Sequence, residues 1–176
     1  MRKDDSMITV IHDLTPTEIA PILAASSQEI QTISPSDGTI HKCIGCFGCW
    51  TKTPGQCVLN DPYCNIGKRL AQSEQLVLIS KMTYGGFSPF VKTCLDRSIG
   101  YLLPFFAIRN NEMHHASRYR EQFSLQVISY GPSNPQERET LRSIVRANAL
   151  NYNAKSHRVI FVENLTHITK LQEVFA

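Results

Sequence analysis

Runs of apolar residues alternate with amphipathic stretches along the chain, and this alternation predicts strands that alternate with helices. The clearest strand is residues 75–80, QLVLIS, and residues 7–14, MITVIHDL, have the same β-branched, apolar character. Apolar runs without polar alternation are typical of strands buried on both faces of a parallel sheet. Shorter apolar runs predict three further strands, at residues 29–33, 123–130 and 157–163.

Helices are predicted between these strands from apolar positions at helical spacing and from start signals. Thr15, followed by Pro16 and Glu18, forms a capping box with proline at the first helical position. Residues 104–120 show no clear period and are predicted to be an irregular insertion. The predicted helices cover residues 16–26, 61–73, 89–101 and 135–153, and a short amphipathic tail follows at 168–175.

Strict alternation of strand and helix favours a parallel sheet covered by helices on both faces, which is a three-layer α/β sandwich. Five strands in 176 residues predict one domain, residues 1–176, with the flavodoxin-like strand order 2-1-3-4-5. Ligands of such sheets bind beyond the carboxyl ends of the strands, where the strand order reverses. The predicted ligand-binding loops are therefore residues 13–17, 81–88 and 130–134.

Charge and composition exclude some classes of protein. The net charge is only +3 and the basic residues are scattered, so we expect no nucleic-acid binding and no anionic membrane partner. No stretch approaches the roughly 20 apolar residues of a membrane span, and the first residues, MRKDDSM, do not resemble a signal peptide. We therefore expect a cytoplasmic protein, in which six cysteines point to metal or redox chemistry before structural disulfides.

Four of the six cysteines are clustered in the stretch CIGCFGCWTKTPGQC, at Cys43, Cys46, Cys49 and Cys57. Gaps of two residues let successive sulfurs face one metal, so the spacing suits a [4Fe-4S] cluster or zinc. The alternative is a packed loop of reduced cysteines, which are small and apolar enough to bury.

The remaining cysteines and a histidine pair have simpler explanations. Cys64 and Cys94 lie among apolar or neutral neighbours and are predicted to be packing cysteines. His114 and His115 are adjacent, so in an extended chain their side chains point apart. We expect them to have a structural or interface role and not to bind a metal.

The stretch between Cys43 and Asn153 resembles the NADPH-dependent FMN reductase and iron-sulfur flavoprotein group of the flavodoxin-like superfamily. The likeness rests on CIGCFGCWTKTPGQCVLND and LISKMTYGGFSPFVKTCLDR, and less specifically on EMHHASRY and RANALN. The resemblance implies FMN at the carboxyl edge of the sheet and electron transfer from NAD(P)H or a redox-protein donor to a small acceptor. It also implies a homodimer. The function that follows is an FMN-dependent oxidoreductase of the NAD(P)H-dependent FMN reductase type.

The resemblance also implies site residues in two of the three loops. In the loop after residues 75–80, the positions that lie against the isoalloxazine ring in the family are Thr83, Tyr84, Gly85 and Gly86. In the third loop, Tyr130 and Gly131 stand where the family closes over the flavin. Asp96 and Arg97 match a family pair at a helix end, and we expect them to form a surface ion pair or an interface contact.

The first loop departs from the family. A GSPR-type loop, whose amides and hydroxyls hold the FMN phosphate at a helix start, is replaced by residues 12–18, which lack glycine and arginine. Asp13 and Glu18 add repulsion, while Thr15 and Thr17 still offer hydroxyls. Losing charge-assisted hydrogen bonds of roughly 1.5 to 3 kcal/mol each predicts weaker FMN binding. Two alternatives therefore stay open: a non-catalytic binding or assembly module that has lost FMN, and a redox protein that works through the cysteine site.

Overall fold

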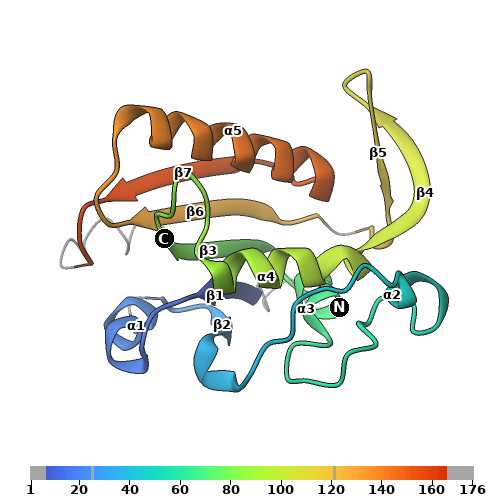
Figure 1. Ribbon diagram of the computed structural model, residues 1–176, viewed down its shortest axis with the longest axis horizontal. Helices are drawn as coiled ribbons and strands as arrows, with labels where there is room; N and C mark the ends of the chain where they lie inside the picture. Colours follow the sequence, from blue (N-terminus) through green and yellow to red (C-terminus); the bar gives the residue numbers. More distant parts are fainter. Residues whose placement is uncertain (1–6, 25, 121, 166–176) are drawn as a thin grey trace.

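The computed structural model describes residues 7–24, 26–120 and 122–165. Five parallel strands form one sheet in the order β2-β1-β3-β6-β7 (Figure 1). Their bounds are β1 Met7–His12, β2 Glu29–Ile33, β3 Gln75–Lys81, β6 Ser124–Tyr130 and β7 His157–Val162. Because β6 and β7 are the fourth and fifth predicted strands, the predicted order 2-1-3-4-5 and the flavodoxin-like α/β fold are confirmed.

The four predicted helices are present with shifted ends, and a short helix at residues 48–51 was not predicted. The helix predicted at 16–26 ends at Leu23, and two others differ more. The predicted helix 61–73 begins only at Ile66, because Asp61 forms a turn in which its carboxylate accepts the Tyr63 N–H at 3.0 Å. The predicted helix 89–101 is α-helical to Arg97 and continues as a 3₁₀ turn, and the predicted tail at 168–175 lies outside the described residues. The bounds are α1 Pro16–Leu23, η1 Pro35–Asp37, α2 Gly48–Thr51, α3 Ile66–Ala71, α4 Pro89–Arg97, η2 Ser98–Tyr101 and α5 Pro135–Tyr152.

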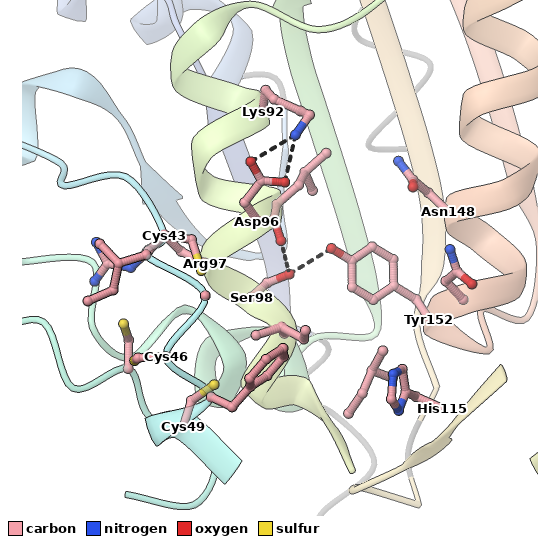
Figure 2. Close-up of a pocket in the computed structure, with 18 of the residues that line it drawn as sticks. Cys43, Cys46, Cys49, Lys92, Asp96, Arg97, Ser98, His115, Asn148 and Tyr152 are labelled. Carbon is pink, nitrogen blue, oxygen red and sulfur yellow. Dashed lines mark hydrogen bonds and ion pairs between the residues drawn. The ribbon is translucent and has the colours of Figure 1, made fainter. Parts of the chain in front are cut away.

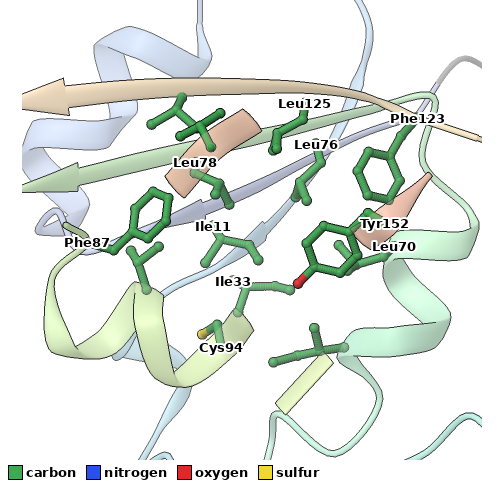
Figure 3. Packing of buried hydrophobic residues seen from close by; sticks show 14 of the residues in the cluster. Ile11, Ile33, Leu70, Leu76, Leu78, Phe87, Cys94, Phe123, Leu125 and Tyr152 are labelled. Carbon is green, nitrogen blue, oxygen red and sulfur yellow. The ribbon is translucent and has the colours of Figure 1, made fainter. Parts of the chain in front are cut away.

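Both faces of the sheet are buried, which explains why the strands show no polar alternation. Successive residues of β3 point to opposite faces: Leu76 and Leu78 pack with α3, α4 and α5 (Figure 3), whereas Val77 and Ile79 pack with α1. Cys94 of α4 is buried in the first cluster, as predicted. The three-layer arrangement follows from this alternation.

The predicted irregular insertion is wrong, because most of residues 104–120 belong to an antiparallel hairpin. Its strands are β4 Leu102–Arg109 and β5 Glu112–Ser117. Asn110 and Asn111 join them with φ angles of 52° and 64°, and left-handed backbone at both positions is typical of a type I′ turn. Neither strand has an alternating buried face, so no period of two appears in the sequence.

The hairpin and α2 lie at the end of the molecule where the parallel strands begin, and the β6 and β7 arrowheads point to the opposite end (Figure 1). The cysteine loop, residues 43–57, is therefore at the amino edge, away from the carboxyl edge. Within the described ranges, no helix combines the length and the apolar character needed to cross a bilayer.

Candidate functional site

Three loops meet at the carboxyl edge, where β1, β3 and β6 end. Asp13, the first residue after β1, connects all three. Its backbone N–H donates to the Ile79 carbonyl at 3.3 Å, and its carboxylate accepts the Lys81 N–H at 3.0 Å and the Tyr130 hydroxyl at 3.1 Å. The sequence marks Asp13 only as a negative charge, because its partners lie 68 and 117 residues further along the chain. This edge is where open α/β sheets bind their ligands.

The loop after β3 carries the four predicted ring-contacting residues in one tight turn. Thr83 and Gly86 exchange backbone hydrogen bonds of 3.1 and 2.8 Å, and Tyr84 and Gly85 have φ angles of 50° and 76°. The Tyr84 side chain is 95% exposed. A Cβ at Gly85 would lie 3.0 Å from the Thr140 Cβ on α5, so glycine lets the turn pack against that helix. The result is a fixed turn that presents an aromatic ring at its tip.

The third loop is tied to the first two through Tyr130 and Gly131. Burial, and then the charge of Asp13, raises the pKa of Tyr130 well above its usual range, so its hydroxyl stays protonated and donates to Asp13. Gly131 has a φ of 98° and its N–H donates to the Val162 carbonyl at 3.1 Å. Both predicted residues thus lie at the edge.

At the start of α1, both hydrogen-bond donors of Thr15 are bonded within the helix itself. The Thr15 N–H and hydroxyl both donate to the Glu18 carboxylate, at 2.8 and 2.7 Å, and the Thr15 and Thr17 hydroxyls are 3.1 Å apart. The bonds from Thr15 lower the pKa of Glu18, so Glu18 is ionised at neutral pH. Pro16 has no N–H to offer. His12 adds no charge near pH 7, because burial lowers the pKa of its imidazole.

The backbone of the cysteine loop packs closely against α3 and η2. A Cβ at Gly67 of α3 would lie 3.0 Å from the Tyr101 nitrogen and 3.1 Å from the Gly55 oxygen. On α2, the Trp50 indole N–H donates to the Ile99 carbonyl at 3.2 Å. Segments far apart in the sequence are therefore locked together at this point.

The four clustered cysteines line one pocket but do not form a metal cage. Cys43 and Cys46 are exposed, Cys57 is half-buried and Cys49 is buried. Burial, and then the neighbouring Cys57, raises the pKa of the Cys49 thiol. In the part of the chain that the structure describes, no group of three His, Cys, Asp or Glu side chains is placed to hold a metal ion. The metal site stays a prediction.

A buried ion pair anchors the cysteine loop to the end of α4. Arg97 Nη1 and Nη2 donate to the Asp61 carboxylate at 2.7 and 3.0 Å, and the two side chains are 0% and 3% exposed. Asp61 also accepts the backbone N–H groups of His41 and Tyr63, at 3.1 and 3.0 Å. The same carboxylate thus fixes residues on both flanks of the cysteine loop.

The expected surface role is therefore wrong for Arg97, because the guanidinium is buried against a residue 36 positions earlier. It holds for Asp96, which forms an exposed ion pair with Lys92 at 2.7 Å. No motif at Asp61 signals its role; only the fold brings it to Arg97.

A pocket of about 690 Å³ lies between the cysteine loop, α4 and α5. Figure 2 shows Cys46 and Cys49 on one side, with Asn148 and Tyr152 of α5 on the other. The Tyr152 hydroxyl is hydrogen-bonded to Ser98 at 2.6 Å. Most of the exposed lining is apolar. The volume is in the range of small-molecule sites, but the pocket lies apart from the turn that carries Tyr84.

The two histidines of β5 point in different directions, as expected. His114 contacts Glu112 Oε2 at 3.1 Å and Asn151 Oδ1 at 3.0 Å. The His115 ring lies against Trp50, with ring centroids 4.9 Å apart. Both positions serve packing between the hairpin and its neighbours.

Comparison with known proteins shows the fold more clearly than the family. No family model matches the chain. An iron-sulfur flavoprotein of Methanocaldococcus jannaschii is 33% identical over 76 residues, which are 43% of this chain and 38% of that protein. The match thus spans well under half of the relative's length.

Two solved structures cover almost the whole chain. An FMN-dependent NADH-azoreductase from Bacillus anthracis, in complex with FMN, has a TM-score of 0.59 and 9% identity, and 97% of each chain is covered. An NAD(P)H:quinone oxidoreductase from Methanothermobacter marburgensis has a TM-score of 0.62 and 9% identity, with 97% of this chain and 92% of that chain covered. At these identities the likeness shows the flavodoxin-like fold.

Proposed function

We propose that the chain is an FMN-dependent oxidoreductase that accepts electrons from NAD(P)H or a redox protein and passes them to a small acceptor. The observation that carries the proposal is that three loops meet at the carboxyl edge, where Asp13 is hydrogen-bonded to Lys81 and Tyr130. The turn that follows Lys81 presents the exposed Tyr84 beside two glycines. The Bacillus anthracis azoreductase is named as FMN-dependent and the Methanocaldococcus jannaschii relative as a flavoprotein, and both names support a flavin cofactor.

The residues at the edge fit one end of FMN and not the other. The turn at residues 83–86 offers an aromatic face and glycine backbone, which suit a flat, uncharged ring. Thr15 at the start of α1 offers no free hydroxyl–amide pair for a phosphate, because Glu18 accepts both of its donors. A bound flavin supplies the hydride and single-electron chemistry, and the protein contributes position and polarity.

Purified protein is expected to bind added FMN and then to oxidise NAD(P)H. Tyr84→Ala should weaken flavin binding by about two- to tenfold, since aromatic stacking is worth about 0.5 to 1.5 kcal/mol. The matched control is Phe105→Ala, which removes an exposed aromatic ring from the hairpin. Quenching of flavin fluorescence on titration at equilibrium measures the effect.

Two results would contradict the proposal. One is wild-type protein that retains no flavin and does not oxidise NAD(P)H in its presence. The other is Tyr84→Ala protein that binds flavin as tightly as the Phe105→Ala control, which would place the flavin elsewhere.

We also propose that Cys43, Cys46, Cys49 and Cys57 hold a [4Fe-4S] cluster or zinc. Their common pocket supports this, although the described arrangement would have to close further around an ion. Gly45, with a φ of 65° and no atom within 4 Å of a Cβ placed there, leaves the loop room to close. Thiolate ligation of either group requires deprotonated sulfurs.

Anaerobically purified protein is expected to contain iron with acid-labile sulfide, or zinc. Cys49→Ser should remove most of the metal because a thiolate ligand is lost. Cys64→Ser, which changes a half-buried cysteine outside the cluster, should leave the metal content unchanged. The metal content of the wild type, Cys49→Ser and Cys64→Ser tests whether the four cysteines bind the metal. Equal metal content in all three would rule out this site.

A homodimer stays a prediction that the hairpin supports. Phe105, Phe106, Ile108 and Met113 are large apolar residues, each at least 66% exposed. Ile108 and Met113 are paired across the hairpin, and exposed large apolar residues that lie together are typical of an interaction surface.

A further inference from the structure

The start of α1 is blocked to an anionic ligand by the chain's own carboxylate. In α/β folds a helix start binds phosphate through free backbone N–H groups and hydroxyls. Here the Thr15 N–H and the Thr15 hydroxyl both donate to Glu18 Oε2, at 2.8 and 2.7 Å, and the next residue is Pro16. Glu18 therefore takes the place of a phosphate oxygen.

A second carboxylate occupies the crevice next to the helix start. Asp13 accepts the Lys81 N–H and the Tyr130 hydroxyl, so donors of the second and third loops are also used. With His12 buried and its pKa lowered, the imidazole is neutral near pH 7 and does not offset the two negative charges. An incoming phosphate would find both donors of Thr15 already bonded to Glu18 and would meet repulsion from the two carboxylates.

The turn that presents Tyr84 does not repel a ligand in this way. Its backbone amides and exposed aromatic ring suit the uncharged isoalloxazine, whose binding does not depend on the phosphate. The two ends of the carboxyl edge thus differ in the chemistry that they accept.

We infer that this edge holds a flavin by its ring, and that Glu18 discriminates against the 5′-phosphate, so that riboflavin binds at least as tightly as FMN. The inference rests on the proposed flavin function and deepens it. A flavin that lacks a phosphate anchor exchanges with the solution and acts as a diffusible ligand of the protein. Glu18 is then a specificity-determining residue.

The test compares FMN and riboflavin binding, by fluorescence titration at low salt, for the wild type, Glu18→Gln and Glu29→Gln. Gln can keep the capping box, so α1 is expected to form, and circular dichroism checks this. Glu18→Gln should tighten FMN binding by about fivefold per phosphate charge, from a Coulomb repulsion of about 1 kcal/mol at 4 Å in water, and leave riboflavin binding nearly unchanged. Glu29→Gln removes the same charge from an exposed position at the start of β2 and should change neither.

The outcomes separate this inference from the proposed function. If FMN binds the wild type measurably more tightly than riboflavin, the inference is wrong while the flavin function stands. Equal effects of Glu18→Gln and Glu29→Gln would also overturn it. If no variant binds either flavin, both the inference and the proposed function fail.

Discussion

Replacing Arg97 by methionine is expected to lower the free energy of unfolding by about 3 to 5 kcal/mol, because a buried carboxylate loses the guanidinium that balances its charge. The side chains of Asp61 and Arg97 are only 3% and 0% exposed, so the carboxylate is poorly solvated when the guanidinium is lost. For a chain of this size, each kcal/mol shifts the melting temperature by about 2 to 4 °C. Chemical denaturation and thermal melting measure the loss.

Lys92→Met is the matched control, since it removes a basic residue from the same helix. The Lys92 and Asp96 side chains are 61% and 47% exposed, and exposed pairs contribute only about 0 to 1 kcal/mol. If Arg97→Met costs no more than Lys92→Met, the buried pair does not anchor the cysteine loop. Trp50, the only tryptophan in the sequence, reports on the loop by its fluorescence.

The same pair makes stability depend on pH. Burial by itself raises the pKa of Asp61, but hydrogen bonds from Arg97 and His41 outweigh it and hold the pKa well below its usual range. A depressed pKa stabilises the fold above the unfolded value of about 3.9 and loses this effect as the pH falls toward the folded value. Asp61→Asn should therefore flatten the loss of stability below about pH 4, as measured by denaturation at pH 3 to 6. An unchanged slope would contradict this assignment.

Gly67→Val is expected to cost about 3 kcal/mol, near the upper end of the usual range for overpacking. The new side chain would meet the backbone of Tyr101, Gly55 and Gly100 at 3.0 to 3.2 Å, and backbone cannot rotate away as a side chain can. We expect the cysteine loop to separate from η2, with a red shift of Trp50 emission before global unfolding. Denaturation followed by both fluorescence and circular dichroism measures the two effects.

Lys68→Val separates the steric clash from helix propensity. Lys68 is the next residue of α3 and is exposed, so valine there carries the same β-branched cost without contacting η2. It removes only an exposed hydrogen bond of 3.2 Å from the Lys68 ammonium to Gln56 of the cysteine loop. Similar losses in both variants, or no early change in Trp50 emission for Gly67→Val, would show that the glycine contact does not hold the loop.

The sequence predicted the sheet because the central strands β1 and β3 are apolar on both faces and apolar positions recur at helical spacing between the strands. The capping box at Thr15 and Glu18 was also readable, since its partners are three residues apart. The hairpin was not readable from alternation, because β4 and β5 have no regularly buried face and the neighbours Phe105 and Phe106 are both exposed. The one local signal in the sequence was the pair of adjacent asparagines, Asn110 and Asn111, which adopt left-handed backbone in the turn.

Local pattern thus predicted the strands, most of the helices and the clustering of the cysteines along the chain, and the strand order followed from the arrangement that five-stranded α/β sheets of this size favour. Only the tertiary structure decided that Asp13 connects the three loops at the carboxyl edge and that Asp61 pairs with Arg97. It also decided that the cysteine loop packs against Gly67. Propensity, capping and periodicity act between residues a few positions apart, so they can be read from the sequence. Each of the other contacts joins residues more than ten positions apart, and such contacts exist only once the packed sheet and helices fix the distance between them.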